Sequence, residues 1–334
     1  MSNIPATMRA WQSSEPGMAA LALVEAPYPH PGPGQALIRV EVAALNFSDV
    51  LMIDDRYQIR PPRPFIPGQE IAGTVVAAGD GCALKAGQRV AGKVDWGGFA
   101  EYACVRTDMT IAIPDGIGAA TAVTLPVVYT TAMVALTEST NIKSGESVLV
   151  LAAAGGIGLA AVEIAKALGA HVIAAASGKD KCALARKYGA DETIDYRESG
   201  WAKAVKELTG GRGVNVIVDP VGGAATNEAL RALAWEGRLL IVGFASGEIP
   251  SIPANRLLLN RAVAIGVYWN HDRDATMLAR VTQRLTTMLT SGAIRPHIGN
   301  EFAFEQLPQA LAALAERRTT GKAILIVADK DAAS

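Results

Sequence analysis

The fold is decided by the stretch Val148–Ala170, VLVLAAAGGIGLAAVEIAKALGA. It opens with four apolar residues, Val148 to Leu151, which are typical of a buried parallel strand. A glycine-rich break follows, and apolar residues then recur at helical spacing up to Gly169, a residue type that commonly ends helices. Such a turn between strand and helix brings backbone N–H groups and a helix N-terminus to a pyrophosphate. The stretch therefore predicts a dinucleotide-binding unit.

Four residues of the turn are the predicted contacts with the dinucleotide: Gly155, Gly156, Ile157 and Gly158. Gly155 and Gly156 leave room for the phosphates, and Gly158 lets the helix pack closely on the strand. The common pattern G-x-G-x-x-G is incomplete, because Ala153 stands at its first glycine. A glycine turn in an α/β domain that binds no nucleotide is the alternative, and the strand–turn–helix context favours binding.

Composition limits the classes of function. The chain has 334 residues, half of them hydrophobic, which favours two domains with large cores. A net charge of −1 argues against nucleic acid or an anionic membrane as a partner. The start of the chain has no apolar signal core, and we expect no uncharged apolar run long enough to cross a bilayer. Three separated cysteines, Cys82, Cys104 and Cys182, fit a reducing compartment, so we expect a cytoplasmic protein.

Two patterns follow each other along the chain. Up to about Leu125, short alternating runs such as 36–42 and 72–77 predict a compact antiparallel, barrel-like domain. Strands and helices then alternate, which predicts a parallel, doubly wound α/β sheet. We expect its strands at 148–151, 172–176, 193–195, 214–219 and 238–243, and its helices at 121–140, 159–168, 179–188, 201–208 and 227–235.

The pattern after Arg261 predicts that the chain leaves this sheet and returns to the first domain. We expect strands there at 263–269, 302–304 and 323–327, and helices at 275–290 and 307–317. The expected domains are therefore 1–125 together with 263–334, and 126–262.

Six motifs in this order carry a resemblance: Asn46-x-Ser48-Asp49, Ile66-Pro-Gly-Gln-Glu70, Leu125-Pro-Val-Val-Tyr-Thr-Thr-Ala132, the glycine turn, Val242-Gly-Phe-Ala-Ser-Gly247 and Arg317-x-Thr-Thr-Gly-Lys322. Together they resemble the medium-chain dehydrogenase/reductase superfamily and, within it, the zinc-free quinone oxidoreductases. The resemblance spans nearly the whole chain. It implies a GroES-like catalytic domain, a Rossmann domain and a homodimer built through the Rossmann sheets.

The resemblance also bears on metal. Alcohol-oxidising relatives hold a catalytic zinc with a cysteine and with the histidine of a G-H-E motif, where this chain has Asn46 and Gln69. Amide oxygens are weak zinc ligands compared with thiolate, imidazole and carboxylate. The four-cysteine zinc lobe of those relatives is missing too, so we expect no metal. Hydride delivery to an electrophilic small molecule, such as a quinone or an α,β-unsaturated carbonyl, remains feasible without a Lewis acid.

The expected cofactor is NADPH. NAD sites place a carboxylate at the end of the second strand, where this chain has Ala176-Ser177-Gly178 followed by lysines. A hydroxyl and an ammonium suit a 2′-phosphate, which a carboxylate would repel. The resemblance places phosphate contacts at four positions: Ser177, Lys181, Tyr196 and Arg317. The lysines could instead be solvated helix charges and Tyr196 a packing residue.

The resemblance puts Asn46 and Tyr57 beside the nicotinamide as catalytic residues. A phenol can donate a proton to the reduced acceptor or orient its carbonyl, and Tyr57 could also be only an aromatic wall. Asn46 could orient a ligand or merely satisfy a buried backbone group. Further expected cofactor contacts are Thr130, near the ribose, and Gly243, Phe244 and Ser246, near the carboxamide. Tyr268 and Trp269 are expected either in the acceptor pocket or at a dimer interface.

Three functions therefore stay open. The leading one is an NADPH-dependent, zinc-independent reductase of quinones. The second is reduction of the C=C bond of an enone or enoyl thioester, for which Arg56, Arg60 and Arg63 could provide a basic entrance. The third is a non-catalytic NADPH-binding sensor, a role that the same fold tolerates.

Overall fold

The computed structural model describes residues 6–328, which form two compact units. Unit 1 takes the chain up to Val127 and again from Ile298 onwards, and unit 2 takes Val128–His297. The expectation that 263–297 returns to the first domain is wrong. This segment stays in unit 2, because its strand joins the parallel sheet there.

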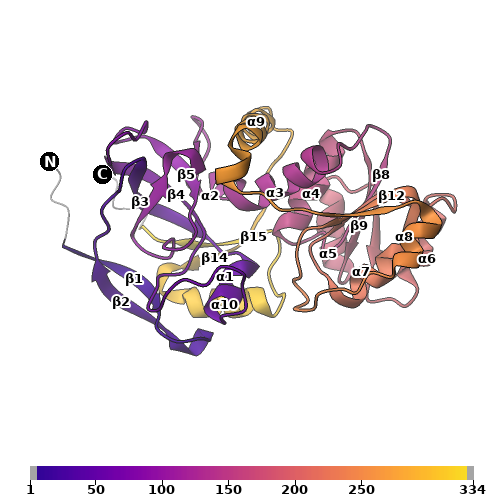
Figure 1. The fold of residues 1–334 in the computed structure, drawn as a ribbon, viewed down its shortest axis with the longest axis horizontal. Helices are drawn as coiled ribbons and strands as arrows, with labels where there is room; N and C mark the ends of the chain where they lie inside the picture. The colour runs from indigo at the N-terminus through magenta and orange to yellow at the C-terminus, as the bar shows by residue number, and fades with distance from the viewer. Residues whose placement is uncertain (1–5, 329–334) are drawn as a thin grey trace. The chain divides into compact units, whose positions relative to one another are not determined.

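Unit 1 is built on a seven-stranded sheet with the order β14-β15-β3-β4-β5-β7, in which β6 also pairs with β3. All its pairs are antiparallel except β14 with β15, and β1 and β2 form a separate antiparallel ribbon. Figure 1 shows the yellow strands β14 and β15, from the end of the chain, beside the indigo and purple strands from its beginning. The elements are β1 Thr7–Ser13, β2 Leu21–Pro27, β3 Gln35–Ala44, α1 Phe47–Ile53, β4 Glu70–Ala78, β5 Arg89–Lys93, β6 Tyr102–Arg106, β7 Thr110–Ala112, α2 Ala119–Ala122, β14 Ile298–Ala303, α10 Leu307–Ala315 and β15 Lys322–Ile326.

The return of the chain completes the core of unit 1. Residues of α10 and β15, including Leu311 and Leu325, are fully buried against apolar side chains of β3 and β4 such as Ile38 and Ile71. Burying a side chain of this size contributes roughly 1.5–3 kcal/mol. The last strand is thus an integral part of the first unit, as the sequence predicts for 302–327.

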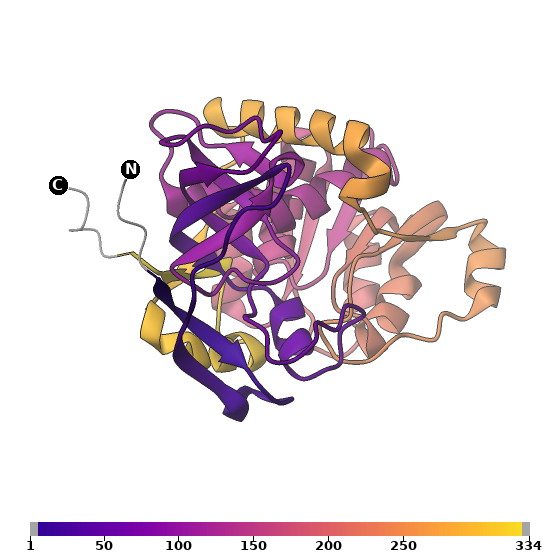
Figure 2. The ribbon, with the colours of Figure 1, turned by 60° about the vertical axis from the view of Figure 1, so that its left-hand side comes forward.

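Unit 2 is a six-stranded parallel sheet with the order β10-β9-β8-β11-β12-β13. This is the doubly wound α/β arrangement that the alternating pattern predicts. Its elements are α3 Thr130–Met133, β8 Ser147–Val150, α4 Gly156–Ala167, β9 His171–Ala176, α5 Lys179–Lys187, β10 Glu192–Asp195, α6 Trp201–Leu208, β11 Val214–Asp219, α7 Gly223–Ala229, β12 Leu233–Ile241, α8 Ala254–Asn260, β13 Val263–Gly266 and α9 His271–Thr290. Figure 2 shows α9 from the side as the long orange helix of this unit.

Two expectations about this sheet are wrong. The helix expected at 227–235 ends early, and the chain becomes strand β12 already at Leu233, because a bulge there joins the segment to β11. Glu236 has φ 56° at this bulge, and a Cβ on Gly237 would lie 2.6 Å from the Leu233 side chain. Strand β13 pairs in parallel with β12, so the chain does not leave the sheet after Arg261.

One apolar helix, Ala119–Glu138, is long enough and apolar enough to cross a membrane, and 83% of its best window is buried inside the protein. The expectation that no such run exists is therefore wrong, although this degree of burial is typical of a core helix. The helix starts two residues before the expected 121, and Pro126 lies inside it in a π-helical turn, Leu125–Tyr129. A wider turn accommodates the ring and the missing N–H of a proline within a helix.

Candidate active site

The glycine turn of unit 2 has the close packing that the sequence predicts. Gly155 caps the N-terminus of α4 without a side chain, and Gly156, Ile157 and Gly158 form the first turn. A Cβ on Gly158 would lie 2.2 Å from the carbonyl oxygen of Ala152, a distance that no side chain tolerates. The backbone at Ala152 therefore lies as close to the start of α4 as it does in a dinucleotide-binding turn. The N–H groups of an uncapped first turn favour an anion.

The end of β9 carries Ser177, half-buried, directly before Gly178, which has φ 89° and caps α5. Lys181 is half-buried in the first turn of α5, and Tyr196 follows the neighbouring strand β10. Its backbone N–H donates to Ala176 at 3.2 Å, and its side chain packs on the core of the sheet. The structure thus brings Ser177, Lys181 and Tyr196 to the carboxyl edge of two adjacent strands.

Sequence reasoning missed Arg197 at this edge. A Cβ on Gly178 would lie 2.9 Å from its guanidinium, so the two residues are neighbours. The guanidinium also pairs with Asp195 at 2.6 Å and holds the pKa of that carboxyl well below its usual range. Asp195 stands opposite Ala176 in the sheet, so a carboxylate does lie close to the end of the second strand. Arg197 compensates the negative charge of Asp195. The sequence signal for this arginine was its position two residues after the end of strand β10.

The loop after β12 holds Gly243, Phe244 and Ser246 at the carboxyl edge of the same sheet. It packs on the turn after β11, where a Cβ on Gly222 would lie 3.0 Å from the Phe244 ring. Asp219, buried at the end of β11, bonds to both loops. Its carboxylate accepts two N–H groups of the turn after β11 at 2.8 and 3.0 Å, and its backbone carbonyl accepts the N–H groups of Val242 and Gly243 at 2.9 and 3.3 Å. Ligands in sheets of this kind bind at this edge.

The remaining predicted residues of unit 2 differ in their surroundings. Thr130 is buried at the start of α3, and the Trp269 indole N–H donates to the neighbouring Thr131 at 3.0 Å. Tyr268 is 77% exposed on the surface of its unit. Trp269 is thus held beside Thr130, whereas Tyr268 lines no enclosed space within unit 2.

Asn46, a predicted site residue of unit 1, bonds to both members of a buried ion pair. Asn46, Glu70 and Lys322 come from the start of α1, from β4 and from β15, and all three are almost inaccessible to solvent. The Lys322 ammonium lies 2.8 Å from both Glu70 Oε2 and Asn46 Oδ1, and 2.9 Å from the carbonyl oxygen of Leu45. The Asn46 amide donates to the same Glu70 oxygen at 3.1 Å. Lys322, absent from the predicted site, thus joins the residues around Asn46.

Two neighbouring groups fix this cluster from outside. The other Glu70 oxygen accepts the backbone N–H of Val127 at 2.8 Å, directly after Pro126 in the π-helical turn. The Asn46 backbone N–H donates to Asp49 Oδ2 at 2.7 Å. Asp49 is fully buried, and its Oδ1 has no hydrogen-bond partner in the described chain. Burial, as the largest cause, raises the pKa of Asp49 to about 7.

Tyr57 lies half-buried in the bend after α1. Asp55, two residues before Tyr57, has φ 60°, the left-handed conformation that glycine favours. Aspartate tolerates this conformation better than most residues do. Arg317, the fourth predicted phosphate contact, belongs to unit 1 and is exposed just after α10, also with a positive φ.

No group of three or more His, Cys, Asp or Glu side chains that could hold a metal occurs within residues 6–328. Gln69 instead accepts a hydrogen bond from Ser48. Arg63, one of the three arginines near Tyr57, is committed to the fold, because its guanidinium donates to the Ile53 carbonyl at 2.8 Å. Arg56 and Arg60 are exposed.

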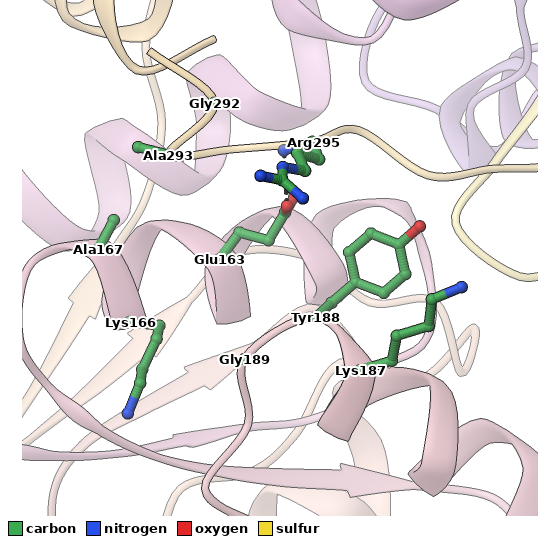
Figure 3. A pocket seen from close by; sticks show the side chains of 9 residues that line it. All are labelled: Glu163, Lys166, Ala167, Lys187, Tyr188, Gly189, Gly292, Ala293 and Arg295. Atoms are coloured by element: carbon green, nitrogen blue, oxygen red, sulfur yellow. Dashed lines mark hydrogen bonds between the residues drawn. The ribbon is translucent and has the colours of Figure 1, made fainter.

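A cavity of about 510 Å³ lies in unit 2 between the ends of α4 and α5 and the segment after α9. It contains none of the predicted site residues. Glu163 accepts the Arg295 backbone N–H at 2.7 Å there and bonds to the Tyr129 hydroxyl. In Figure 3 the ammonium groups of Lys166 and Lys187 point away from Glu163 and from each other. The two lysines therefore do not converge on Glu163, whereas the Arg295 side chain lies beside its carboxylate.

Two family models match the chain, one within each unit. Residues 32–115 match the alcohol dehydrogenase GroES-like domain, and residues 156–284 match the zinc-binding dehydrogenase family. Quinone oxidoreductase-like protein 2 of Rattus norvegicus is 39% identical over 299 residues, which cover 88% of this chain and 85% of that protein.

Two solved structures are similar to the whole chain. A mycobacterial protein complexed with NADPH is 32% identical with a TM-score of 0.90, over 96% of this chain and all of that one. Quinone oxidoreductase of Escherichia coli complexed with NADPH is 27% identical with a TM-score of 0.88, over the same shares.

Proposed function

Because the chain belongs to the quinone oxidoreductase family of the medium-chain dehydrogenase/reductase superfamily, we propose that it is an NADPH-dependent enzyme that reduces a quinone without zinc. The observation that carries the proposal is the close packing of Gly158 in the first turn of α4. The backbone of Ala152 lies so near to it that no residue with a Cβ would fit there. The quinone is supported by the names of relatives, among them quinone oxidoreductase of Escherichia coli complexed with NADPH.

The residues of unit 2 fit such a cofactor. The uncapped first turn of α4 offers N–H groups and the positive end of a helix to a pyrophosphate. Gly243, whose N–H donates to the backbone carbonyl of Asp219, would contact the carboxamide together with Phe244 and Ser246, and Thr130 would contact the ribose. When bound, NADPH supplies the hydride, and the chain's own residues bind it and orient the acceptor.

The preference for NADPH over NADH rests on the edge of β9 and β10. Ser177 and Lys181 offer a hydroxyl and an ammonium there, and Arg197 offsets the charge of Asp195. Charge-assisted hydrogen bonds of this kind favour a phosphate strongly. Tyr196 packs on the core and would contribute its ring face or hydroxyl rather than a charge. Arg317 is proposed as a further phosphate contact from unit 1.

Asn46 and Tyr57 are the proposed catalytic residues. Burial of Asn46 between Glu70 and Lys322 supports a role as a fixed hydrogen-bonding group toward the acceptor. A tyrosine hydroxyl is protonated at neutral pH, so Tyr57 would donate a proton or a hydrogen bond to the reduced oxygen. Trp269, held beside Thr130 through Thr131, is proposed to line the acceptor pocket.

The proposal of zinc-free chemistry rests on the donor set. The amide oxygen of Asn46 already accepts from the ammonium of Lys322, and Gln69 accepts from Ser48. Two amides engaged in this way are poor ligands for zinc. An acceptor that is electrophilic by itself needs no Lewis acid.

We also propose a cytoplasmic homodimer. Strand β13 ends the parallel sheet of unit 2 and leaves an open edge, and Val263 on it is 47% exposed. Leu258, Leu259 and Tyr268 nearby in the chain are each more than 70% exposed. An open edge with large apolar side chains is a surface that a second copy would cover. Tyr268 is thus assigned to this interface, and three unpaired cysteines support a reducing compartment.

The proposal is tested by following NADPH absorbance with purified, chelator-treated protein against quinones, simple enones and crotonyl-CoA. We expect rapid oxidation with a quinone, undiminished by the chelator, and much slower oxidation of NADH. Preference for an enone or crotonyl-CoA would assign the protein to C=C reduction. Tight NADPH binding without any turnover would instead support the sensor.

A charge-reversal pair separates cofactor recognition from general effects. Lys181→Glu should raise the KM for NADPH by about tenfold or more, as loss of one charged hydrogen bond does, and leave the KM for NADH nearly unchanged. Lys203→Glu, at an exposed side chain of α6, makes the same charge change away from this edge. Equal effects of both variants on NADPH would refute the assignment of Lys181.

A further inference from the structure

Lys322 is buried in unit 1, at a position that an apolar side chain could have filled. The Lys322 side chain is 4% exposed and its partner Glu70 is fully buried. Removing such a pair from water costs several kcal/mol per ion, and apolar replacements of buried ion pairs are often neutral or stabilising. Stability alone therefore gives a weak reason for this lysine, and its contacts suggest another.

The partners of Asn46 are of opposite character. An ammonium can only donate hydrogen bonds and a carboxylate can only accept them. The Asn46 oxygen must therefore face Lys322 at 2.8 Å, and its NH2 group must face Glu70 at 3.1 Å. Reversing the amide would set its NH2 against the ammonium and its oxygen against the carboxylate. This pair thus selects one of the two amide orientations.

The hydrogen bonds among Lys322, Glu70 and Asn46 leave one N–H group of the Asn46 amide without a partner in the described chain. Lys322 has three N–H groups, and its three acceptors are Leu45, Asn46 and Glu70. The Asn46 NH2 has two N–H groups, and within the described chain only the one to Glu70 has a partner. Asn46 retains 7% of its surface, so the second N–H is the polar group that it can offer to a ligand.

We infer that Lys322 is a positioning residue that, together with Glu70, fixes the Asn46 amide as a hydrogen-bond donor toward the reacting ligand. The inference rests on the proposed function, which places Asn46 beside the acceptor. A fixed donor stabilises the negative charge that develops on a quinone or carbonyl oxygen as hydride arrives. The lysine itself touches neither acceptor nor cofactor and acts through Asn46.

The test uses two variants of the full-length protein. Lys322→Met keeps the length of the side chain but removes the ammonium, so the amide is free to reverse. Asn46→Asp keeps an acceptor for Lys322 but has no N–H to donate. Both should lower kcat by about 100-fold, which is what the loss of one aimed donor costs, while the Kd for NADPH changes by less than about threefold. Lys85→Met, which removes an exposed lysine of the same unit, is the matched control.

Rescue distinguishes positioning from a structural role. Lys322→Ala leaves space for a small amine, and added ethylammonium should restore kcat, whereas tetramethylammonium, which has no N–H group, should not. A fall in thermal stability that parallels the loss of kcat, without amine rescue, would overturn the inference. Unchanged kcat in both Lys322→Met and Asn46→Asp would overturn it as well.

A readout without turnover keeps this inference separate from the proposed function. With ¹⁵N-labelled asparagine, the two side-chain N–H protons of Asn46, assigned from Asn46→Ala, should exchange with solvent at different rates. One should exchange slowly because it is bonded to Glu70, and this asymmetry should vanish in Lys322→Met. If no acceptor is turned over but the asymmetry depends on Lys322, the proposed function fails and the positioning role stands. If the asymmetry persists without Lys322, the positioning role fails.

Discussion

Replacing Asp49 by asparagine should stabilise the protein at neutral pH and have the opposite effect in acid. The carboxyl is fully buried, and only one of its oxygens accepts a hydrogen bond from the chain. Burial raises its pKa from 3.8 to about 7 in the folded state. The folded protein therefore binds more protons at this group than the unfolded chain between these two pH values, and stability falls as the pH rises through this window.

The size of the effect follows from the shift. About 3 pKa units at about 1.4 kcal/mol per unit correspond to about 4 kcal/mol lost between pH about 4 and about 7. Asp49→Asn removes this loss, because the amide does not ionise and its oxygen can still accept from the Asn46 N–H. The new NH2 group has no buried acceptor, which costs about 1–3 kcal/mol at every pH.

The assay is thermal unfolding of Asp49→Asn and wild type at several pH values. The difference in Tm should be negative near pH about 4, become positive as the pH rises, and level off above pH about 7. Asp115→Asn replaces an exposed aspartate of the same unit and should give a constant difference. A difference for Asp49→Asn that is equally constant would refute the reasoning, since Asp49 would then be ionised in the fold throughout.

Three further predictions concern other parts of the chain. Gly158→Ala places a Cβ 2.2 Å from the Ala152 carbonyl and should weaken NADPH binding by more than about tenfold in a fluorescence titration, whereas Gly118→Ala, with open space around its Cβ, should leave it unchanged. Leu258→Lys on α8 should convert the proposed dimer to a monomer in light scattering, and an unchanged mass would exclude this surface. Tyr57→Phe should lower kcat by about 10- to 100-fold if the hydroxyl donates, and an unchanged kcat would leave only an aromatic wall.

Local sequence signals predicted the buried parallel strands well. The run Val214–Asp219 and the helix Trp201–Leu208 have the same bounds in the structure as in the prediction. Each is an apolar or amphipathic stretch whose own pattern decides its conformation. The prediction of a helix at the segment from Leu233 is wrong because a distant pairing partner, and not its own pattern, decides its conformation. Its composition favours a helix, but pairing with β11 across a bulge makes it a strand, and no local pattern records that partner.

The candidate site was predictable only in part. Gly158 follows from the spacing of the glycine turn, and its close approach confirms the predicted packing. Lys322 lies within a motif that the sequence already singled out, but its partner Glu70 is 252 residues away in the chain. A contact of this separation leaves no periodic signal. The sequence did not predict Arg197 as a site residue, because its position beside Gly178 depends on the pairing of two strands, β9 and β10.

The insertion of unit 2 into unit 1 has a consequence for the order of folding during synthesis. Unit 2 ends at His297, so all of its strands emerge from the ribosome before β15 does. Unit 1, although it begins the chain, cannot complete its sheet at that stage, and Glu70 lacks its ammonium partner until Lys322 is made. Domains are usually finished from the N-terminus onward. Here the nascent chain should reverse that order, with the inserted unit maturing first and the outer one last.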